Sequence, residues 1–509
     1  MEYKQSLIEY KEEYQMKYKS SLLKASKVPS LGGDLGEAMK SLFLIVLLVS
    51  FTIITSAQKK LTLKDAIEIG ISKNLDVLQS GLQMEQAAIA LNQSRENKLP
   101  DLNAVANQGI NFGRSIDPYT NGYIDQSVGY VNYGASTNVL LFNGFSLQNA
   151  VKSNKLGYDA SRLELQQAKD NLTIKIILAY LQVLNADEIL DQSRDFAQVT
   201  QEQVNRLGVL NNSGSILPSD YYDLKGQLAS DQITIVENKA SLETAKVSLS
   251  QLLNIPYDKN LELEKIADSS LNNNYTDEPD QIYATALQQF AEVTATELRT
   301  KSAKKNIRAV KGQLFPTLSF NGNINTNYSS AANRDFYVNT TDVTSSNYVT
   351  VDGANYPVIQ KQDNYNSQKI MFGSQVNNNL YYTLNIGLTV PLFNAHRIRN
   401  QVKLATLGYK NNQLIEQSTK TQLQQNIEQA YVNLNSSRDK YKLLQDQVNA
   451  FKESFRTAEI RFNAGAITSV DYLIVKNNFN RAQSNLTTAK YDFVLRGKVL
   501  DYYGGKPLW

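Results

Sequence analysis

Alternating apolar and polar positions mark four segments of the chain as β-strands. From Tyr382 to Val390 every second residue is apolar and the residues between are small or polar, and 131–139 repeats this pattern in the same phase. In 318–328 the apolar residues share one parity, while Ser319 and a row of asparagines share the other. Because successive strand side chains point to opposite faces, the pattern predicts a sheet with one apolar and one polar face. We expect the strands at about 101–113, 129–142, 317–328 and 380–393.

The polar face of the predicted sheet carries Asn321, Asn323, Asn325 and Asn327. Unpaired amides are costly to bury in a dry core, whereas beside a water-filled lumen they cost little. The pattern therefore favours a sheet that borders an aqueous channel. An ordinary sandwich with a polar outer face is the alternative.

Two long stretches lack the residues that break helices. Neither glycine nor proline occurs in 159–207 or in 409–464. At about 1.5 Å per residue, a helix of roughly 65 residues from about 145 to 210 would be on the order of 100 Å long, too long for the interior of a globular domain. Apolar residues at alternating spacings of three and four predict a coiled-coil-like seam along it. They are Leu165, Ala168, Leu172, Ile176, Ala179, Val183, Ala186 and Leu190.

The chain contains an internal duplication, which is the most informative feature of the sequence. Leu141-Phe142-Asn143 recurs 251 positions later as Leu392-Phe393-Asn394. Further matches at the same displacement pair Gly214, Ile216, Asp220 and Tyr221 with Gly465, Ile467, Asp471 and Tyr472. Upstream matches are displaced by only 216 positions, so the second copy carries 35 extra residues. We expect these extra residues in a loop at about 329–379.

The duplication predicts two repeats, 58–275 and 276–509. Each is expected to contain a helix, two strands and a long helical hairpin. The hairpins are expected at about 145–252 and 395–498, with tight breaks near 211–218 and 463–467. A connector ends the first repeat and a C-terminal tail ends the second.

The N-terminal region is typical of export. Residues 39–57 combine a basic start, a short apolar run and small residues before Gln58, which predicts a cleaved signal peptide. A membrane anchor is the alternative. Residues 1–38 precede this signal, so we interpret them as a start-site artefact, with translation beginning at Met39.

Composition disfavours several classes of function. The formal net charge is only +3, from 52 basic and 49 acidic residues, so no nucleic-acid partner is expected. The chain has no cysteine and a single histidine, His396, which we expect to begin a helix in a structural role. These residues supply most zinc sites and much acid/base chemistry, so the sequence disfavours an enzyme and predicts no metal or cofactor.

The four predicted strands cannot close a membrane barrel alone, since small barrels need about eight strands and open edges are not tolerated in lipid. Several chains must therefore share one barrel. The duplicated Leu-Phe-Asn elbow, Pro100 and Pro316 before the first strand of each repeat, the turn 462–468 and the C-terminal end 500–508 resemble the TolC-like outer-membrane efflux proteins. The likeness covers essentially all of residues 60–509.

This resemblance implies an α+β membrane protein that forms a homotrimer. Its twelve strands would form one barrel in outer-membrane lipid, and its helices a periplasmic coiled-coil tunnel. The implied function is an outer-membrane exit channel of a tripartite efflux or type I secretion system, a passive conduit for exported small molecules or proteins. The implied partners are a periplasmic adaptor (membrane fusion protein) and an inner-membrane pump of the resistance-nodulation-division, ABC or type I secretion class.

The resemblance also implies roles for residues near the helix breaks. Gly214 and Gly465, which would allow a close approach or a positive φ, and the apolar Ile216 and Ile467 would dock the adaptor; simple turn chemistry is the alternative. Asp220 and Asp471 would line a periplasmic gate that selects by charge. Helix capping is the alternative for these acids, because Thr468-x-x-Asp471 resembles a capping box.

Five aromatic residues are expected at strand positions, in an interfacial aromatic belt or in core packing. They are Tyr130, Tyr133, Phe142, Tyr381 and Phe393. Lysine and aspartate residues within the long helices are expected on solvated faces.

Two other classes of function remain as alternatives. The first is a soluble periplasmic coiled-coil scaffold, which the strand alternation disfavours. The second is a surface-carbohydrate or cell-wall enzyme with paired carboxylates. No candidate acid pair lies in a loop cluster with the polar and aromatic partners that a substrate pocket needs.

Overall fold

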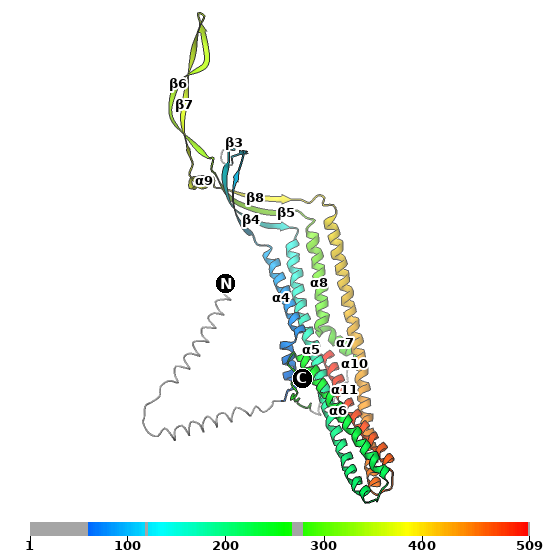
Figure 1. Ribbon diagram of the computed structural model, residues 1–509. Coiled ribbons are helices and arrows are strands. Elements are labelled where there is room, and N and C mark those ends of the chain that lie inside the picture. Colours follow the sequence, from blue (N-terminus) through cyan, green and yellow to red (C-terminus); the bar gives the residue numbers. More distant parts are fainter. Residues whose placement is uncertain (1–59, 118–120, 267–277, 507–509) are drawn as a thin grey trace, which may run out of the picture. The chain divides into compact units, whose positions relative to one another are not determined.

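A computed structural model describes residues 60–117, 121–266 and 278–506 (Figure 1). The chain divides into the units Met1–Lys60 and Leu61–Trp509, and the description below concerns the second. The predicted signal peptide at 39–57 and the segment 1–38 lie outside the described residues. In the part of the chain that is described, no helix combines the length and the apolar character needed to span a bilayer.

Four antiparallel strands form the main sheet, in the order β1-β4-β5-β8. They are β1 (Asp101–Asn111), β4 (Val128–Asn143), β5 (Thr317–Ser329) and β8 (Tyr381–Thr389). Of the predicted strands, the fourth is shorter than expected, because it ends at Thr389. Phe393 therefore lies beyond the strand, contrary to the prediction, and its ring packs against His396 instead (centroids 5.7 Å apart).

The register of the sheet confirms the predicted division into two faces. Ile324 lies opposite Ala135 on β4 and Tyr382 on β8, and Leu318 lies opposite Phe142 and Leu388. Asn321, on the other face, lies opposite Asn138 and Asn385. One face is therefore mainly apolar across all four strands, and the other is rich in amides and hydroxyls.

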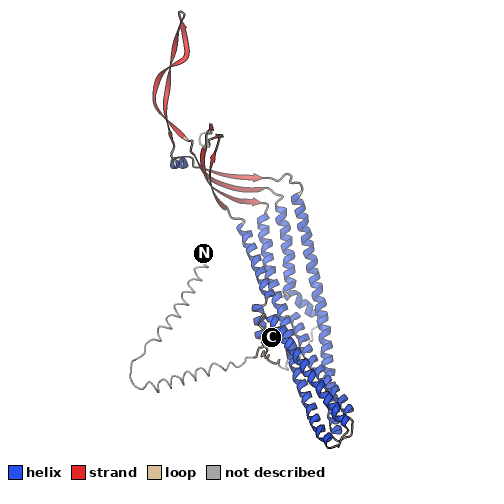
Figure 2. Cartoon of the chain, in the orientation of Figure 1, coloured by secondary structure: helices blue, strands red, loops and turns tan. Residues whose placement is uncertain are grey.

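The long helices connect to the sheet at one of its ends (Figure 2). β1 follows helix α4 and β5 follows helix α8, while β4 and β8 lead into the two longest helices. The helices are α3 (Leu63–Lys73), α4 (Leu75–Glu96), α5 (Ser146–Asn212), α6 (Pro218–Leu253), α7 (Pro279–Gln289), α8 (Ala291–Gly312), α10 (Arg397–Asn463) and α11 (Ser469–Tyr503). α5 and α10 each have 67 residues, which corresponds to about 100 Å at 1.5 Å per residue.

The duplication is visible in the backbone where strands turn into helices. Gly144 and Phe145 both have positive φ (62° and 61°), and so do their counterparts Ala395 and His396 (49° and 59°). Two successive left-handed residues thus form the elbow in both repeats, although the side chains differ. His396 is the N-cap residue of α10, as the sequence predicted.

The insertion at 329–379 is not a loop, contrary to the prediction. It forms a long two-stranded hairpin of β6 (Asn333–Val351) and β7 (Ala354–Lys369), followed by the short helix α9 (Phe372–Asn378). A smaller hairpin of β2 (Arg114–Ile116) and β3 (Tyr123–Asp125) lies between β1 and β4 in the sequence. Both hairpins connect strands at the sheet end opposite the long helices (Figure 1).

The base of the long hairpin is fixed to β5 by the buried side chain of Gln375. Its Oε1 accepts a hydrogen bond from the Ser329 amide at 2.9 Å, and its Nε2 donates to the carbonyls of Ser329 (3.0 Å) and Ile370 (2.9 Å). The Ser329 hydroxyl in turn donates to Asp117, and both residues are buried. The hairpin is therefore attached through a satisfied buried network rather than a flexible linker.

Apolar packing between the long helices provides the core. The largest cluster joins α3, α4, α5, α6 and α11, and Ile176, Tyr180, Leu249 and Leu253 within it are fully buried. The hydroxyl of Tyr180 lies 2.8 Å from the carbonyl oxygens of both Leu61 and Glu264. These contacts tie the segment before α3 and the segment after α6 to α5. A second cluster joins α7, α8, α10 and α11.

Candidate functional site

The two helix breaks lie together at the end of the helical hairpins that is farthest from the sheet (Figures 1 and 2). A small apolar cluster joins all four helices there, with Val204 and Leu207 on α5, Leu224 on α6, Phe462 on α10 and Tyr472 on α11. The rings of Phe462 and Tyr472 stack with centroids 4.6 Å apart. We call this end of the molecule, residues 204–224 and 460–476, the helix tip.

A polar contact also joins the two hairpins at the helix tip. Arg206 on α5 donates hydrogen bonds to the side-chain oxygen of Asn463 and to its carbonyl oxygen, the latter at 2.7 Å. Because Asn463 is the last residue of α10, this guanidinium also satisfies a helix C-terminal carbonyl. The two breaks are therefore held side by side.

Gly214 and Gly465 each provide a positive φ at the breaks, 68° and 71°. No atom lies within 4 Å of the position that a Cβ would occupy at either residue, so close backbone approach is not the reason for these glycines. Ile216 and Ile467 pack against the apolar cluster of the helix tip and are half-buried. The exposed apolar side chains of the helix tip include Leu217 and Val470, at 69% and 55%.

The two candidate gate acids make different contacts. Asp471 and Thr468 form a cap at the start of α11, in which the Asp471 amide donates to the threonine hydroxyl at 3.2 Å and that hydroxyl donates to the Asp471 carboxylate at 2.8 Å. The Asp220 carboxylate on α6 instead accepts a hydrogen bond from the backbone amide of Ser469, the first residue of α11, at 3.4 Å. Asp223 completes this link by accepting the Ser469 hydroxyl at 2.8 Å. Helix capping is thus present at both acids, and gate lining remains a prediction.

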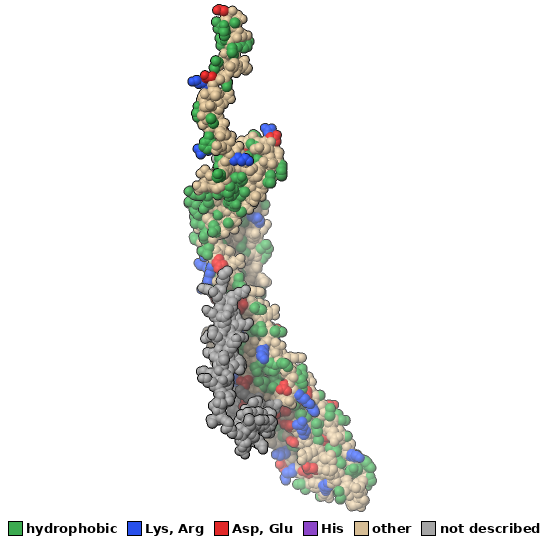
Figure 3. Space-filling view, turned by 60° about the vertical axis from the view of Figure 1, so that its left-hand side comes forward, with side chains coloured by type: hydrophobic (Ala, Val, Ile, Leu, Met, Phe, Trp, Pro, Cys, Tyr) green, Lys and Arg blue, Asp and Glu red, His purple; other side chains and the backbone are tan. Residues whose placement is uncertain are grey.

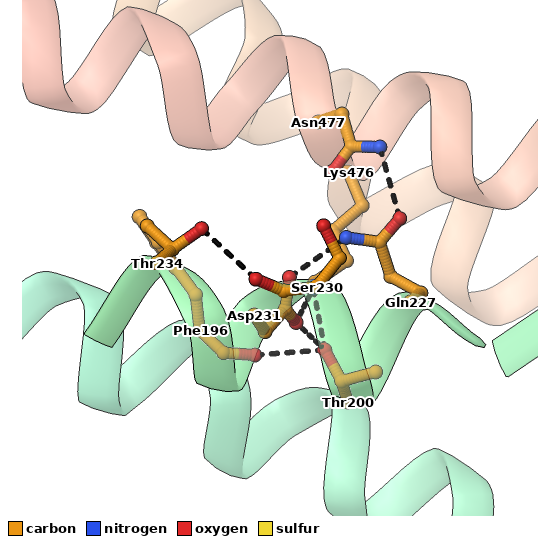
Figure 4. Close-up of polar contacts among 8 residues, drawn as sticks. All are labelled: Phe196, Thr200, Gln227, Ser230, Asp231, Thr234, Lys476 and Asn477. Carbon is orange, nitrogen blue, oxygen red and sulfur yellow. Dashed lines mark hydrogen bonds and ion pairs between the residues drawn. The ribbon is translucent and has the colours of Figure 1, made fainter. Parts of the chain in front are cut away.

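A buried ion pair lies where the helix tip meets the rest of the long helices (Figure 4). Nζ of Lys476 on α11 lies 2.7 Å from Oδ2 of Asp231 on α6 and 2.5 Å from the hydroxyl of Thr200 on α5. Gln227 donates to the other carboxylate oxygen of Asp231 at 2.7 Å, and Asn477 donates to Gln227 at 3.3 Å. Burial lowers the pKa of Lys476 below its ordinary value, and the nearby carboxylate of Asp231 only partly opposes this shift. Three helices are tied together by this network.

Lysine and aspartate residues within the long helices were predicted on solvated faces, and this prediction is wrong for Lys476 and Asp231. Asp231 lies seven residues after the buried Leu224, and Lys476 lies four residues after the buried Tyr472. Both charges therefore occupy seam positions of their helices, where apolar residues are usual. Opposite charges on two seams were the signal that could have revealed the pair.

The side chains of the sheet and of the helices differ in character (Figure 3). Hydrophobic side chains gather over the sheet in this view, whereas acidic and basic side chains lie mainly along the helices. The most exposed apolar residues of the sheet lie on its apolar face; they are Leu102, Tyr382, Leu384, Ile386 and Leu388. An exposed apolar band above water-facing helices is what an embedded sheet requires.

The family model described as "Outer membrane efflux protein" matches residues 67–254 and 282–496, one segment for each half of the duplication. The chain belongs to this family. The resemblance to the TolC-like outer-membrane efflux proteins is thereby confirmed, and so is the fold class of duplicated strand and long-hairpin units.

Individual relatives are distant but cover nearly the whole chain. The outer membrane efflux protein BepC of Brucella suis is 20% identical over 91% of this chain and 90% of its own length. The outer membrane protein TolC of Vibrio cholerae is 22% identical over 85% of this chain and 93% of its own. The solved Campylobacter jejuni CmeC outer membrane channel has the same fold, with a TM-score of 0.70 at 17% identity over 87% of this chain and 85% of that one.

The protein is an outer-membrane efflux channel whose helices extend into the periplasm. The family consists of non-enzymatic transporters, which rules out the alternative of a carbohydrate-active enzyme. It likewise rules out the alternative of a soluble periplasmic scaffold. In the described residues, no group of three or more histidine, cysteine, aspartate or glutamate side chains could hold a metal ion.

Proposed function

We propose that three copies of this chain close one twelve-stranded barrel and one helical tunnel, and that the helix tip is the controlled periplasmic entrance. The observation that carries this proposal is the incomplete sheet. Within the described strands, β1 and β8 each pair on one side only. Unpaired backbone groups are costly in lipid, so each free edge needs a strand from another copy.

Two features support three copies arranged around a water-filled passage. The sheet has an apolar face suited to lipid and an amide-rich face suited to water. Four strands per chain give twelve in a trimer, which exceeds the roughly eight that the smallest membrane barrels need. Cargo would then pass along the polar face and through the helical tube without chemical change.

The oligomeric state is tested by native mass spectrometry of the detergent-solubilised mature channel. We expect a single species with three times the mass of the chain. A monomer that stays folded in detergent would contradict the proposal. Cross-linking in cells before purification would show which adaptor and inner-membrane pump accompany the trimer.

The proposed partner at the helix tip is a periplasmic adaptor that presents apolar side chains. Leu217 and Val470 are exposed beside Gly214 and Gly465, whose missing side chains leave the surface of each break open. Ile216 and Ile467 support these turns from within. The docking surface that we propose therefore combines the two glycines with their exposed apolar neighbours.

We expect the charge of Asp220 and Asp471 to give the channel a preference for cations. A unit charge about 4 Å from an ion contributes about 1 kcal/mol even in water, or about a fivefold change in local concentration. Because the charge acts on cations and anions in opposite directions, replacing both residues with asparagine should lower the cation-to-anion permeability ratio by at least about fivefold, as measured by reversal potentials in planar bilayers. Unchanged selectivity would contradict gate lining by these acids.

The alanine variants of the same residues separate charge from capping. Asparagine keeps a side-chain oxygen at each position, which can accept the hydrogen bond from the Ser469 amide at 220 and from the Thr468 hydroxyl at 471. Alanine removes both hydrogen bonds. Asp220→Ala with Asp471→Ala should therefore lose cation preference and also conduct more, because the helix starts are loosened. Equal conductance in the alanine and asparagine variants would show that the caps do not restrain the entrance.

A further inference from the structure

The polar face of the sheet is almost free of charge. The four strands of the main sheet contain one ionisable acid or base in total beyond tyrosine, Asp101, at the first position of β1. Its carboxylate accepts hydrogen bonds from the backbone amide of Asn138 at 2.6 Å and from the side-chain amide of Asn103 at 3.3 Å. The single charge therefore lies at the helix end of the sheet and is partly compensated by its neighbours.

Amide and hydroxyl side chains form cross-strand rows on this face, which also carries the uncharged apolar side chains of Val105 and Leu140. Asn138, Asn321 and Asn385 lie in one row, and Nδ2 of Asn321 donates to Oδ1 of Asn385 at 3.1 Å. The next row contains Asn103, Ser136, Asn323 and Thr383. Farther from the helices, Oδ1 of Asn325 lies only 2.7 Å from the position that a Cβ of Gly134 would occupy, so this asparagine lies across the glycine on the same face.

Such a lining discriminates differently from a ring of acids or bases. A charged ring concentrates ions of one sign and repels the other. An asparagine side chain carries two donor hydrogens and an acceptor oxygen, so it can pair with either sign and with uncharged polar groups. A passage lined in this way favours cargo by hydrogen bonding and is indifferent to the sign of its charge.

We propose that the asparagine face is a charge-neutral selectivity segment of the channel, which admits anionic, cationic and uncharged polar cargo alike. Asn321, Asn323, Asn325 and Asn385 are its specificity-determining residues. This inference rests on the proposed trimer, in which the face lines the lumen. Selection by charge is then confined to other parts of the channel, such as the helix tip.

The natural absence of cysteine allows a direct test with a single introduced thiol. Asn325→Cys places a thiol on the polar face, and the neighbouring Ile324→Cys places one on the apolar face. Asn325 lies four residues along β5 from the Asp101 row, about 14 Å at 3.4 Å per residue, which exceeds the Debye length of about 8 Å at physiological salt. Asp101 should therefore not bias this position.

The thiols are probed with membrane-impermeant methanethiosulfonates, one cationic and one anionic, added on the external side of trimers in planar bilayers at 0.15 M salt. Both reagents should block current through Asn325→Cys, and the ratio of their rates should lie within about twofold of the ratio for free cysteine. A nearby unit charge would shift that ratio about fivefold or more. Ile324→Cys should not react, because its side chain faces lipid.

Three outcomes overturn the proposal. A strong preference for one reagent at Asn325→Cys would show that the segment is charged, and the same preference abolished by Asp101→Asn would identify its source. A conducting channel in which Asn325→Cys does not react would show that this face does not line the passage. Wild-type protein that forms neither trimers nor channels would refute the proposed function itself, which the mass measurement detects separately.

Discussion

Replacing Lys476 with methionine should destabilise the helical hairpins by about 3–5 kcal/mol, the usual cost of removing one partner of a buried ion pair. The variant leaves the carboxylate of Asp231 buried, with only Gln227 and Thr200 to satisfy it. Because the pair joins α5, α6 and α11, the loss should lower the thermal unfolding midpoint measured by circular dichroism. An unchanged midpoint would contradict the buried pair.

Two further variants identify the cause of that loss. Lys476→Met combined with Asp231→Leu removes both charges, and such apolar replacements are often neutral or stabilising, so the midpoint should recover. Arg456→Met breaks the exposed pair of Arg456 with Glu453 (2.9 Å) and should cost less than about 1 kcal/mol. A double variant as unstable as Lys476→Met would show that packing at this position, rather than charge, determines the loss.

Gly144→Ala should destabilise the junction between sheet and helices by about 2–5 kcal/mol, from left-handed backbone strain and overpacking together. The φ of Gly144 is positive, and a Cβ built there would lie only 2.2 Å from the carbonyl oxygen of Gly312. Backbone atoms cannot rotate away as a side chain can, so α8 would have to move away from the elbow. We expect a lower unfolding midpoint and less folded channel in the outer membrane.

The second repeat and two other glycines provide the controls for this substitution. Ala395 occupies the position equivalent to Gly144 and has a positive φ, so the elbow conformation alone does not exclude alanine. Gly353→Ala should cost only the backbone strain of about 1–2 kcal/mol, since nothing lies within 4 Å of its Cβ position. Gly81→Ala, in the open interior of α4, should be neutral or slightly stabilising. Equal effects at Gly144 and Gly353 would contradict the contact with Gly312.

Features that repeat with a regular period could be predicted from the sequence. Period-two alternation placed the asparagine row on one face of β5, and the register bears this out. Absence of glycine and proline predicted the long rods, and the duplication predicted that their breaks would match. The glycine positions at the breaks followed from turn chemistry, because few other residues adopt a positive φ without strain.

Features that depend on irregular or long-range contacts could not be predicted in this way. The long hairpin was missed because register shifts between Tyr337 and Asn339 and between Thr344 and Tyr348 interrupt its alternation. The pairing of Lys476 with Asp231 joins residues 245 positions apart, so the seam position of each charge could indicate its burial but could not identify its partner. Phe393 and its counterpart Phe142 were both predicted at strand positions, yet β8 ends at Thr389, whereas β4 continues to Asn143.

The long hairpin also determines which part of the chain meets the environment. It is attached through Gln375 to the sheet end opposite the helices, and the helices of this channel extend into the periplasm. The ribbon from Asn333 to Lys369 therefore projects outside the cell, with aromatic side chains such as Tyr348 and Tyr356 exposed. An antibody raised against this ribbon would recognise intact bacteria, and a protease in the medium could cut it without reaching the long helices.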